Sequence, residues 1–87
     1  MKKVWLDGAW EEYIAWLATD KKTLKKINEL IKDIERNGYR CLGKPEPLTG
    51  NLSGWWSIRI NQKDRLVFKI ASGEIIFLQC GSHYLEK

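Results

Sequence analysis

A small set of side chains in the second half of this chain could together carry out acid–base chemistry on a phosphodiester. The set consists of the carboxylate Glu46, the arginines Arg59 and Arg65, and His83, which is the only histidine. A carboxylate can act as base and an imidazole as acid, while guanidinium groups stabilise the negative charge that builds on a phosphate. RNA carries its own nucleophile, the 2′-hydroxyl beside each phosphate. This combination could therefore cleave RNA without a metal.

Each of these residue types also has an ordinary structural interpretation. A lone histidine near a terminus often packs or faces solvent, arginines on an exposed strand face are usually solvated, and a glutamate between prolines has no fixed direction. Composition and residue type alone therefore leave the function open.

Composition bounds the fold and the partners. The 87 residues predict a single domain, 1–87, and the 44% hydrophobic content supports a folded core. The net charge of +4 suits a polyanionic partner without identifying nucleic acid. No apolar stretch resembles a signal peptide or a membrane span, so we expect a cytoplasmic protein with no membrane partner. Cys41 and Cys80 lack metal-ligand spacing, so we expect ordinary thiols, no metal and no cofactor.

The first half of the chain predicts a short strand followed by a helical hairpin. Residues 2–6 are β-like, and Asp7 and Asp20 can each cap a helix. Apolar residues then recur at helical spacing and predict the packing face of each helix. They are Trp10, Tyr13, Ile14 and Leu17 in the first helix, and Leu24, Ile27, Ile31 and Ile34 in the second. The outer face of the second helix is rich in lysine.

The second half predicts a long loop and a sheet. Residues 38–53 contain prolines and glycines, which is typical of a functional loop, and strand-like runs follow at 55–60, 65–70 and 74–82. Alternation assigns one face of these strands to the core: Trp56, Ile58, Ile60, Leu66, Phe68, Ile70, Ile76, Leu78 and Cys80. The opposite face is predicted to be open and basic, and it carries Arg59, Arg65 and His83.

Several motifs are specific enough to indicate a family. They are residues 25–33 of the second helix, Gly43-Lys44-Pro45-Glu46-Pro47-Leu48 in the loop, Asn51-Leu52-Ser53-Gly54 after it, Arg65-Leu66-Val67, and the closing His83-Tyr84. In these motifs the chain resembles the YoeB group of toxins in the RelE/ParE superfamily of bacterial toxin–antitoxin modules.

The resemblance implies a fold and a chemistry. The fold is α+β, with an N-terminal helical hairpin packed on one face of a small twisted antiparallel sheet. The activity is that of an endoribonuclease that cuts mRNA in the ribosomal A site and so inhibits translation. By the same resemblance Glu46 is the base, His83 the acid and Arg65 the arginine that stabilises the transition state. Tyr84 shapes the site, and Lys44 and Arg59 contact phosphate.

The resemblance also implies partners. These are the ribosome with its mRNA, and a cognate antitoxin whose disordered acidic or amphipathic segment folds along the toxin surface. A homodimer is compatible with the apolar surface of the helices.

Two departures from the family pattern keep alternatives open. Thr49 stands where a lysine is expected, and Ile58 replaces a basic residue that could contact ribosomal RNA. The alternatives are a non-catalytic binding toxin, like the gyrase-poisoning branch of the superfamily, and a basic interaction module whose nuclease site has decayed.

Overall fold

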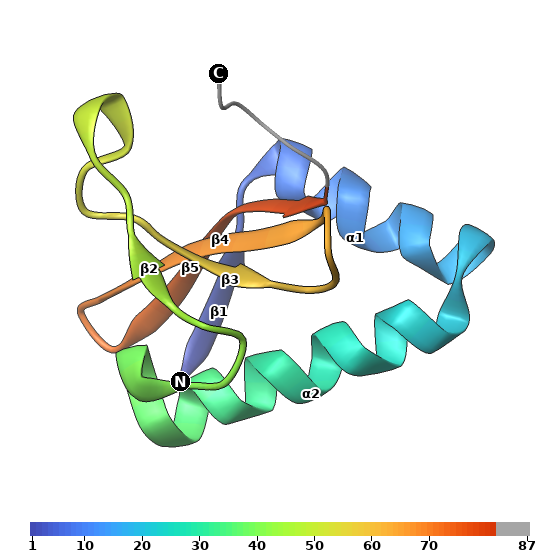
Figure 1. Cartoon of the computed structure of the whole chain (residues 1–87), viewed down its shortest axis with the longest axis horizontal. Helices are drawn as coiled ribbons and strands as arrows, with labels where there is room; N and C mark the ends of the chain where they lie inside the picture. The colour runs from blue at the N-terminus through green and yellow to red at the C-terminus, as the bar shows by residue number, and fades with distance from the viewer. Residues whose placement is uncertain (82–87) are drawn as a thin grey trace.

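The computed structural model describes residues 1–81 and shows a helical hairpin beside a five-stranded sheet (Figure 1). In chain order the elements are β1 (Lys2–Trp5), α1 (Asp7–Thr19), α2 (Lys21–Asn37), the 3-10 turn η1 (Gly38–Arg40), β2 (Glu46–Pro47), the 3-10 turn η2 (Gly50–Leu52), β3 (Trp56–Arg59), β4 (Arg65–Ala71) and β5 (Glu74–Gly81). The predicted α+β class is confirmed. Neither helix of this described range is long and apolar enough to cross a membrane.

The order of the strands brings distant segments of the chain together. It is β1-β5-β4-β3-β2, and all neighbours are antiparallel except β1, which runs parallel to β5. Antiparallel neighbours can be joined by tight turns, whereas a parallel pair needs a long crossover connection. Here that crossover contains both helices and the remaining strands. The antiparallel prediction holds for β2 to β5, and the N-terminal strand adds one parallel pair.

The second helix packs as its apolar spacing predicts. Its inward face is buried against the sheet and consists of Ile27, Leu30, Ile31 and Ile34. The strands supply the other side of the same core with Ile58, Ile60, Leu66, Phe68, Ile75, Phe77 and Cys80. The outer face of α2 is polar, so its burial and its charge agree with a simple amphipathic helix.

The first helix packs through a different face from the predicted one. Ala9 is fully buried, and Tyr13 and Trp16 pack partly buried against the core. Three residues of the predicted packing face are instead largely exposed: Trp10 at 47%, Ile14 at 43% and Leu17 at 52%. The inward face is thus rotated by roughly one residue position, ~100° around the helix axis.

The two helices also differ in how their N-termini are capped. Asp20 caps α2, because its Oδ1 accepts a hydrogen bond from the Thr23 backbone N–H at 3.1 Å. Asp7 does not cap α1. It is the first helical residue, Leu6 occupies the cap position, and no side chain there bonds the helix.

A β-bulge changes which residues of β5 face the core. Phe68 of β4 lies opposite Phe77, but the preceding Val67 lies opposite Gln79, which leaves Leu78 as an extra residue. One extra residue inverts the alternation of a strand. The buried apolar residues of β5 are therefore Ile75, Phe77 and Cys80. The predicted core positions Ile76 and Leu78 are wrong, since both are only partly buried.

Candidate functional site

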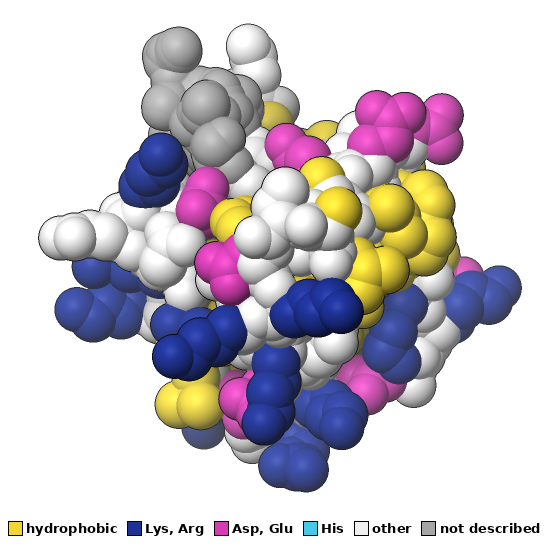
Figure 2. All heavy atoms as spheres, turned by 90° about the vertical axis from the view of Figure 1, so that its right-hand side faces the viewer, with side chains coloured by type: hydrophobic (Ala, Val, Ile, Leu, Met, Phe, Trp, Pro, Cys, Tyr) yellow, Lys and Arg dark blue, Asp and Glu magenta, His cyan; other side chains and the backbone are white. Residues whose placement is uncertain are grey.

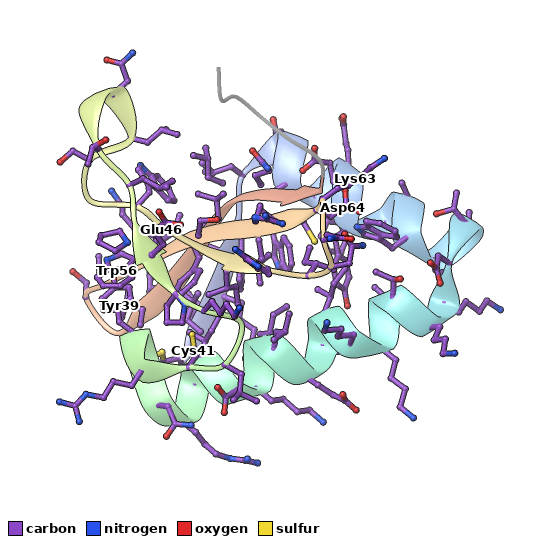
Figure 3. The ribbon with its side chains drawn as sticks, viewed as in Figure 1. Tyr39, Cys41, Glu46, Trp56, Lys63 and Asp64 are labelled. Atoms are coloured by element: carbon purple, nitrogen blue, oxygen red, sulfur yellow. The ribbon has the colours of Figure 1, made fainter. Side chains whose placement is uncertain are left out.

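The loop in front of β3 is fastened to the rest of the molecule at its start. The Tyr39 ring stacks on Trp56 with 4.5 Å between ring centroids, and its hydroxyl accepts a hydrogen bond from the Ile70 N–H at 2.7 Å (Figure 3). The Leu42 N–H then donates to Asp33 Oδ2 at 2.6 Å. These contacts fix where the loop begins to cross the edge of the sheet.

Gly43 brings this loop against β3. Its carbonyl accepts a hydrogen bond from the Arg59 N–H at 2.8 Å, and its φ is +94°. A Cβ at this position would lie 3.0 Å from the Cβ of Ile58, so only glycine fits without a shift of the backbone. Ile58 is fully buried in this contact. Ile58 itself is therefore part of the core, and whether a basic residue at this position in relatives contacts ribosomal RNA stays a prediction.

The short strand β2 fixes the position of Glu46, which periodicity left undetermined. Glu46 lies opposite Ser57 of β3, and Ser57 lies opposite Val67 of β4. Directly opposite residues place their side chains on the same face of a sheet. Glu46 is exposed and ends this cross-strand row on the face turned away from the helices (Figure 3).

Both arginines occupy the next row on that face. Arg59 lies opposite Arg65, and Arg65 lies opposite Gly81 of β5. Successive rows on one face are two residues apart, or ~6.8 Å, so the Glu46 row and the arginine row are neighbours. Within residues 1–81, neither guanidinium is paired with a carboxylate. Because like charges directly opposite repel, an anion between them is favoured.

The β3–β4 turn holds Arg65 in place. Its Nη1 donates to the carbonyl oxygens of Asn61 at 2.9 Å, Gln62 at 3.3 Å and Asp64 at 3.1 Å. The turn is itself closed by side chains, since Asn61 Oδ1 accepts from the Asp64 N–H at 2.8 Å and Asn61 Nδ2 donates to Asp64 Oδ2 at 2.9 Å. One edge of the guanidinium is thereby fixed to the backbone.

The middle of this sheet face is less open than predicted. Ser57 is 6% exposed, Val67 1% and Gln79 7%. Arg59 is exposed, Arg65 is partly buried, and the Lys69 ammonium lies 4.6 Å from the Trp55 ring centroid. The accessible charge of the face is therefore at its margins.

His83 and Tyr84 lie outside the described residues. The described part of β5 ends at Gly81, directly opposite Arg65. The prediction that His83 shares a face with Arg59 and Arg65 therefore stays a prediction.

Two clefts extend the basic surface from Arg59 toward α2. One has a volume of about 380 Å³ and is lined by Lys26, Glu29, Leu30, Leu42, Gly43, Lys44 and Arg59. The other has a volume of about 550 Å³ and is lined by Lys22, Thr23, Lys25, Lys26, Glu29, Ile60 and Asn61. Lys44 is exposed at the rim of the first cleft, with a φ of +57°. The predicted phosphate contacts, Lys44 and Arg59, thus share one cleft.

Neither cysteine is suited to chemistry. Both are buried free thiols. Desolvation, assisted by the charge of Glu12, raises the pKa of Cys80 to about 12, and desolvation together with Asp33 raises the pKa of Cys41. A thiol with a raised pKa carries little of the reactive thiolate. In the described range, no group of three or more His, Cys, Asp and Glu residues could hold a metal ion.

Comparisons with known proteins agree with these features. A family model described as "YoeB-like toxin of bacterial type II toxin-antitoxin system" matches residues 5–84. The chain belongs to this family of toxins. Toxin YoeB of Escherichia coli K12 is 46% identical over 84 residues, which is 97% of this chain and 100% of the relative. Toxin YoeB of a Synechocystis strain is likewise 46% identical over 84 residues, covering 97% of this chain and 98% of the relative.

Solved structures of the family have the same fold. A YoeB/ParE toxin from Agrobacterium tumefaciens is 42% identical and covers 97% of this chain and 100% of its own, with a TM-score of 0.91. A YoeB dimer and a heterotetrameric YoeB–YefM toxin–antitoxin complex, both from Staphylococcus aureus, give TM-scores of 0.89 at 42% identity. Each covers 97% of this chain and 98% of the matched chain.

Sequence reasoning missed the residues that hold the toxin's site together. Asn61 and Asp64 lie between the strand-like runs 55–60 and 65–70, where no motif marks them, although Asx side chains commonly close turns on their own backbone. In the sequence Gly43 stands out only as a member of the family motif. Its role depends on how closely the loop approaches β3, which no local pattern indicates.

Proposed function

We propose that this toxin is a metal-independent endoribonuclease that cleaves mRNA in the ribosomal A site and thereby inhibits translation. Glu46 takes the proton of the 2′-hydroxyl, and the 2′-oxygen attacks the adjacent phosphorus. The 5′-oxygen leaves with a proton supplied by His83, so that a 2′,3′-cyclic phosphate and a 5′-hydroxyl are formed. Tyr84 shapes the site beside His83.

One observation carries this proposal. Glu46 stands one row from the Arg59–Arg65 pair on a single sheet face, and within residues 1–81 neither guanidinium has a carboxylate partner. A phosphate bound between the arginines would have its 2′-hydroxyl within reach of a carboxylate in the next row. Arg65, fixed to the turn by its Nη1, would stabilise the developing charge without reorganising.

Lys44 is proposed to assist by binding a flanking phosphate. It shares a cleft with Arg59 and supplies positive charge there. The lining of that cleft also includes the apolar residues Leu30 and Leu42.

The partners follow from the family. We propose that a cognate antitoxin neutralises the toxin, as the toxin–antitoxin complex of the Staphylococcus aureus relative suggests, and that the toxin forms homodimers, as in the YoeB dimer from that organism. We further propose that the toxin acts in the cytoplasm, where its ribosomal substrate is.

Primer extension on a defined mRNA in a cell-free translation reaction tests the activity. The intact protein is compared with His83→Gln, Glu46→Gln and the control Glu11→Gln, an exposed carboxylate on α1. We expect new cuts only with ribosomes present. Loss of either the acid or the base should slow cleavage by ~10²–10⁴-fold, while Glu11→Gln should cut like the intact protein.

Two results would contradict the proposed nuclease activity. Inhibited translation without cuts from any variant would indicate a non-catalytic toxin that acts by binding. Absence of both cuts and inhibition would indicate a decayed interaction module, and Thr49→Lys would then be the first reversion to examine.

A further inference from the structure

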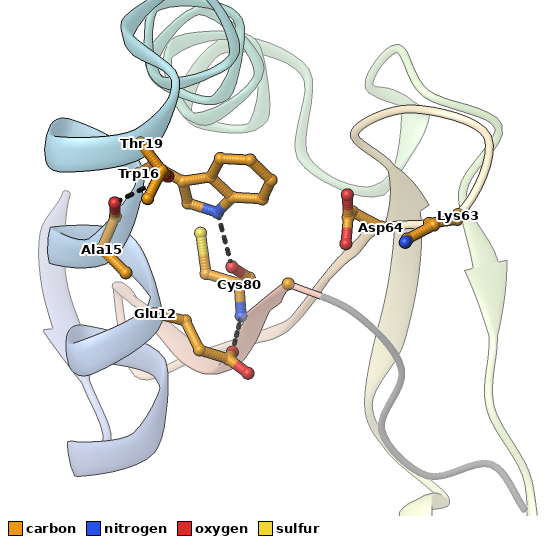
Figure 4. A pocket seen from close by; sticks show the side chains of 8 residues that line it. Glu12, Ala15, Trp16, Thr19, Lys63, Asp64 and Cys80 are labelled. Atoms are coloured by element: carbon orange, nitrogen blue, oxygen red, sulfur yellow. Dashed lines mark hydrogen bonds between the residues drawn. The ribbon is translucent and has the colours of Figure 1, made fainter.

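Side chains of α1 hold the backbone of β5 just before the strand ends. Glu12 Oε1 accepts a hydrogen bond from the Cys80 N–H at 2.7 Å, and Trp16 Nε1 donates to the Cys80 carbonyl at 2.9 Å (Figure 4). The next residue, Gly81, lies against the same carboxylate, because a Cβ at Gly81 would be 3.3 Å from Glu12 Cδ. The two peptide groups that flank the Cα of Cys80 are therefore each held by a side chain of α1.

The sheet itself leaves these backbone groups without a partner. Cys80 lies opposite Leu66 of β4, and its N–H and C=O both turn away from that strand. On its other side β5 pairs with β1 only as far as Phe77. A buried N–H or C=O without a partner is costly, and here Glu12 and Trp16 supply the partners that β1 does not. This explains why a carboxylate occupies the inner face of α1.

The two hydrogen bonds from Glu12 and Trp16 hold β5 one residue before the end of its described part. Gly81 is opposite Arg65, and two peptide units separate it from His83. Because consecutive Cα atoms are ~3.8 Å apart, only a short length of chain links Gly81 to His83. The backbone at Cys80 and Gly81 is therefore the last described anchor before the proposed acid.

We propose that Glu12 and Trp16 are positioning residues that set where His83 is presented to the scissile phosphate. This inference rests on the proposed nuclease function, in which His83 is the acid. Neither residue needs to touch RNA. Their loss should therefore lower the rate of the chemical step and leave substrate binding unchanged, because small misplacement of a catalytic group slows reaction steeply.

Single-turnover cleavage of mRNA on programmed ribosomes provides the test, with the maximal rate and the half-saturating toxin concentration measured separately. Glu12→Ala removes the acceptor, Glu12→Gln restores an acceptor oxygen, and Trp16→Phe removes the indole N–H while keeping a ring. Thr19→Val is the matched control. Thr19 lines the same cavity of about 360 Å³ but its hydroxyl bonds only to the Ala15 carbonyl of its own helix.

We expect Glu12→Ala and Trp16→Phe to lower the maximal rate about 10-fold or more with unchanged half-saturation. Glu12→Gln should recover most of the rate, and Thr19→Val should match the intact protein. Thermal melting identifies any variant that has lost its fold. If Glu12→Ala does not fold, the test rests on Trp16→Phe. A wild-type maximal rate for both Glu12→Ala and Trp16→Phe would overturn the proposal, as would a loss confined to half-saturation.

Combination with His83→Gln separates positioning from general damage. If Glu12 acts through His83, Glu12→Ala should cause no further loss in the His83→Gln background, whereas independent losses would multiply. If the double variant loses rate by the product of the two single losses, the positioning role is overturned. Wild-type cleavage by His83→Gln alone would instead contradict the proposed function, so the two failures are distinguishable.

Discussion

The two helices of this toxin cover the same side of the sheet, but the kinds of side chain that they turn inward and outward differ. The second helix places its isoleucines inward and its charged residues outward. The first helix turns Trp10, Ile14 and Leu17 toward solvent. On the face shown in Figure 2, a patch of apolar side chains lies next to many lysine and arginine side chains.

The inner face of α1 explains this difference. It contains Glu12 and Trp16, whose polar atoms bond to the backbone of β5, and the small Ala9, which allows close approach. A helix that completes an unpaired strand edge needs hydrogen-bonding side chains at the contact, so apolar spacing no longer marks its packing face. The comparison teaches that α2 stabilises the core, whereas α1 mainly completes β5.

A matched pair of isoleucines tests this division with the largest expected effect. Ile34 on α2 is fully buried and Ile14 on α1 is 43% exposed. We expect Ile34→Ala to lower the free energy of unfolding by ~2–5 kcal/mol, because it leaves a cavity, and Ile14→Ala to change it by about 0.5 kcal/mol or less. Urea unfolding of both variants measures the difference. Similar losses in the two variants would show that α1 is as much a core helix as α2.

The lysine-rich N-terminal end of α2 should contribute more to ribosome binding than its C-terminal end. Reversing the charge of Lys22, Lys25 and Lys26 on α2 together is expected to weaken ribosome binding about 10-fold or more and to reduce its salt dependence, because ribosomal RNA is polyanionic. Sedimentation with ribosomes at several salt concentrations measures both quantities.

The control for this experiment keeps the change in net charge the same. It reverses Lys32, Arg36 and Arg40, which are exposed at the other end of α2 and just beyond it. Equal weakening by both triple variants would show that net charge matters and that the α2 face is not a docking surface. No weakening by either would show that the outer face of α2 does not bind the ribosome.

Much of this fold could be predicted from the sequence, and the errors share a physical cause. Periodicity located both helices and the strands β3 to β5, because burial of apolar side chains dominates those elements. It failed at α1 and in the first half of β5. In α1 the packing depends on hydrogen bonds between Glu12 or Trp16 and a distant backbone, and in β5 a single bulged residue, Leu78, inverts the faces.

The candidate site was only partly predictable for a similar reason. Alternation placed Arg59 and Arg65 on one face, and their pairing confirms it. Glu46 was assigned by family resemblance, since the strand that positions it is two residues long and forms through pairing with β3. The loop approach at Gly43 that carries Lys44 and Glu46 to the sheet depends on contacts between segments distant in sequence.

The two aspartates at the helix starts give the smallest expected effect and the sharpest comparison. Hydrogen bonds from Thr23 to the carboxylate hold the pKa of Asp20 below its ordinary value of 3.8. A carboxyl group whose pKa is lowered by folding stabilises the protein at neutral pH, and this contribution is lost as the pH falls through the lowered pKa. Asp20→Ala should therefore lower the melting temperature at pH 7 and progressively less below pH 3.8, whereas Asp7→Ala should cause little change at either pH. Asp20→Asn separates the cap from the charge, because asparagine also caps helices but does not titrate. A larger loss from Asp7→Ala than from Asp20→Ala would reverse the assignment of the capped helix.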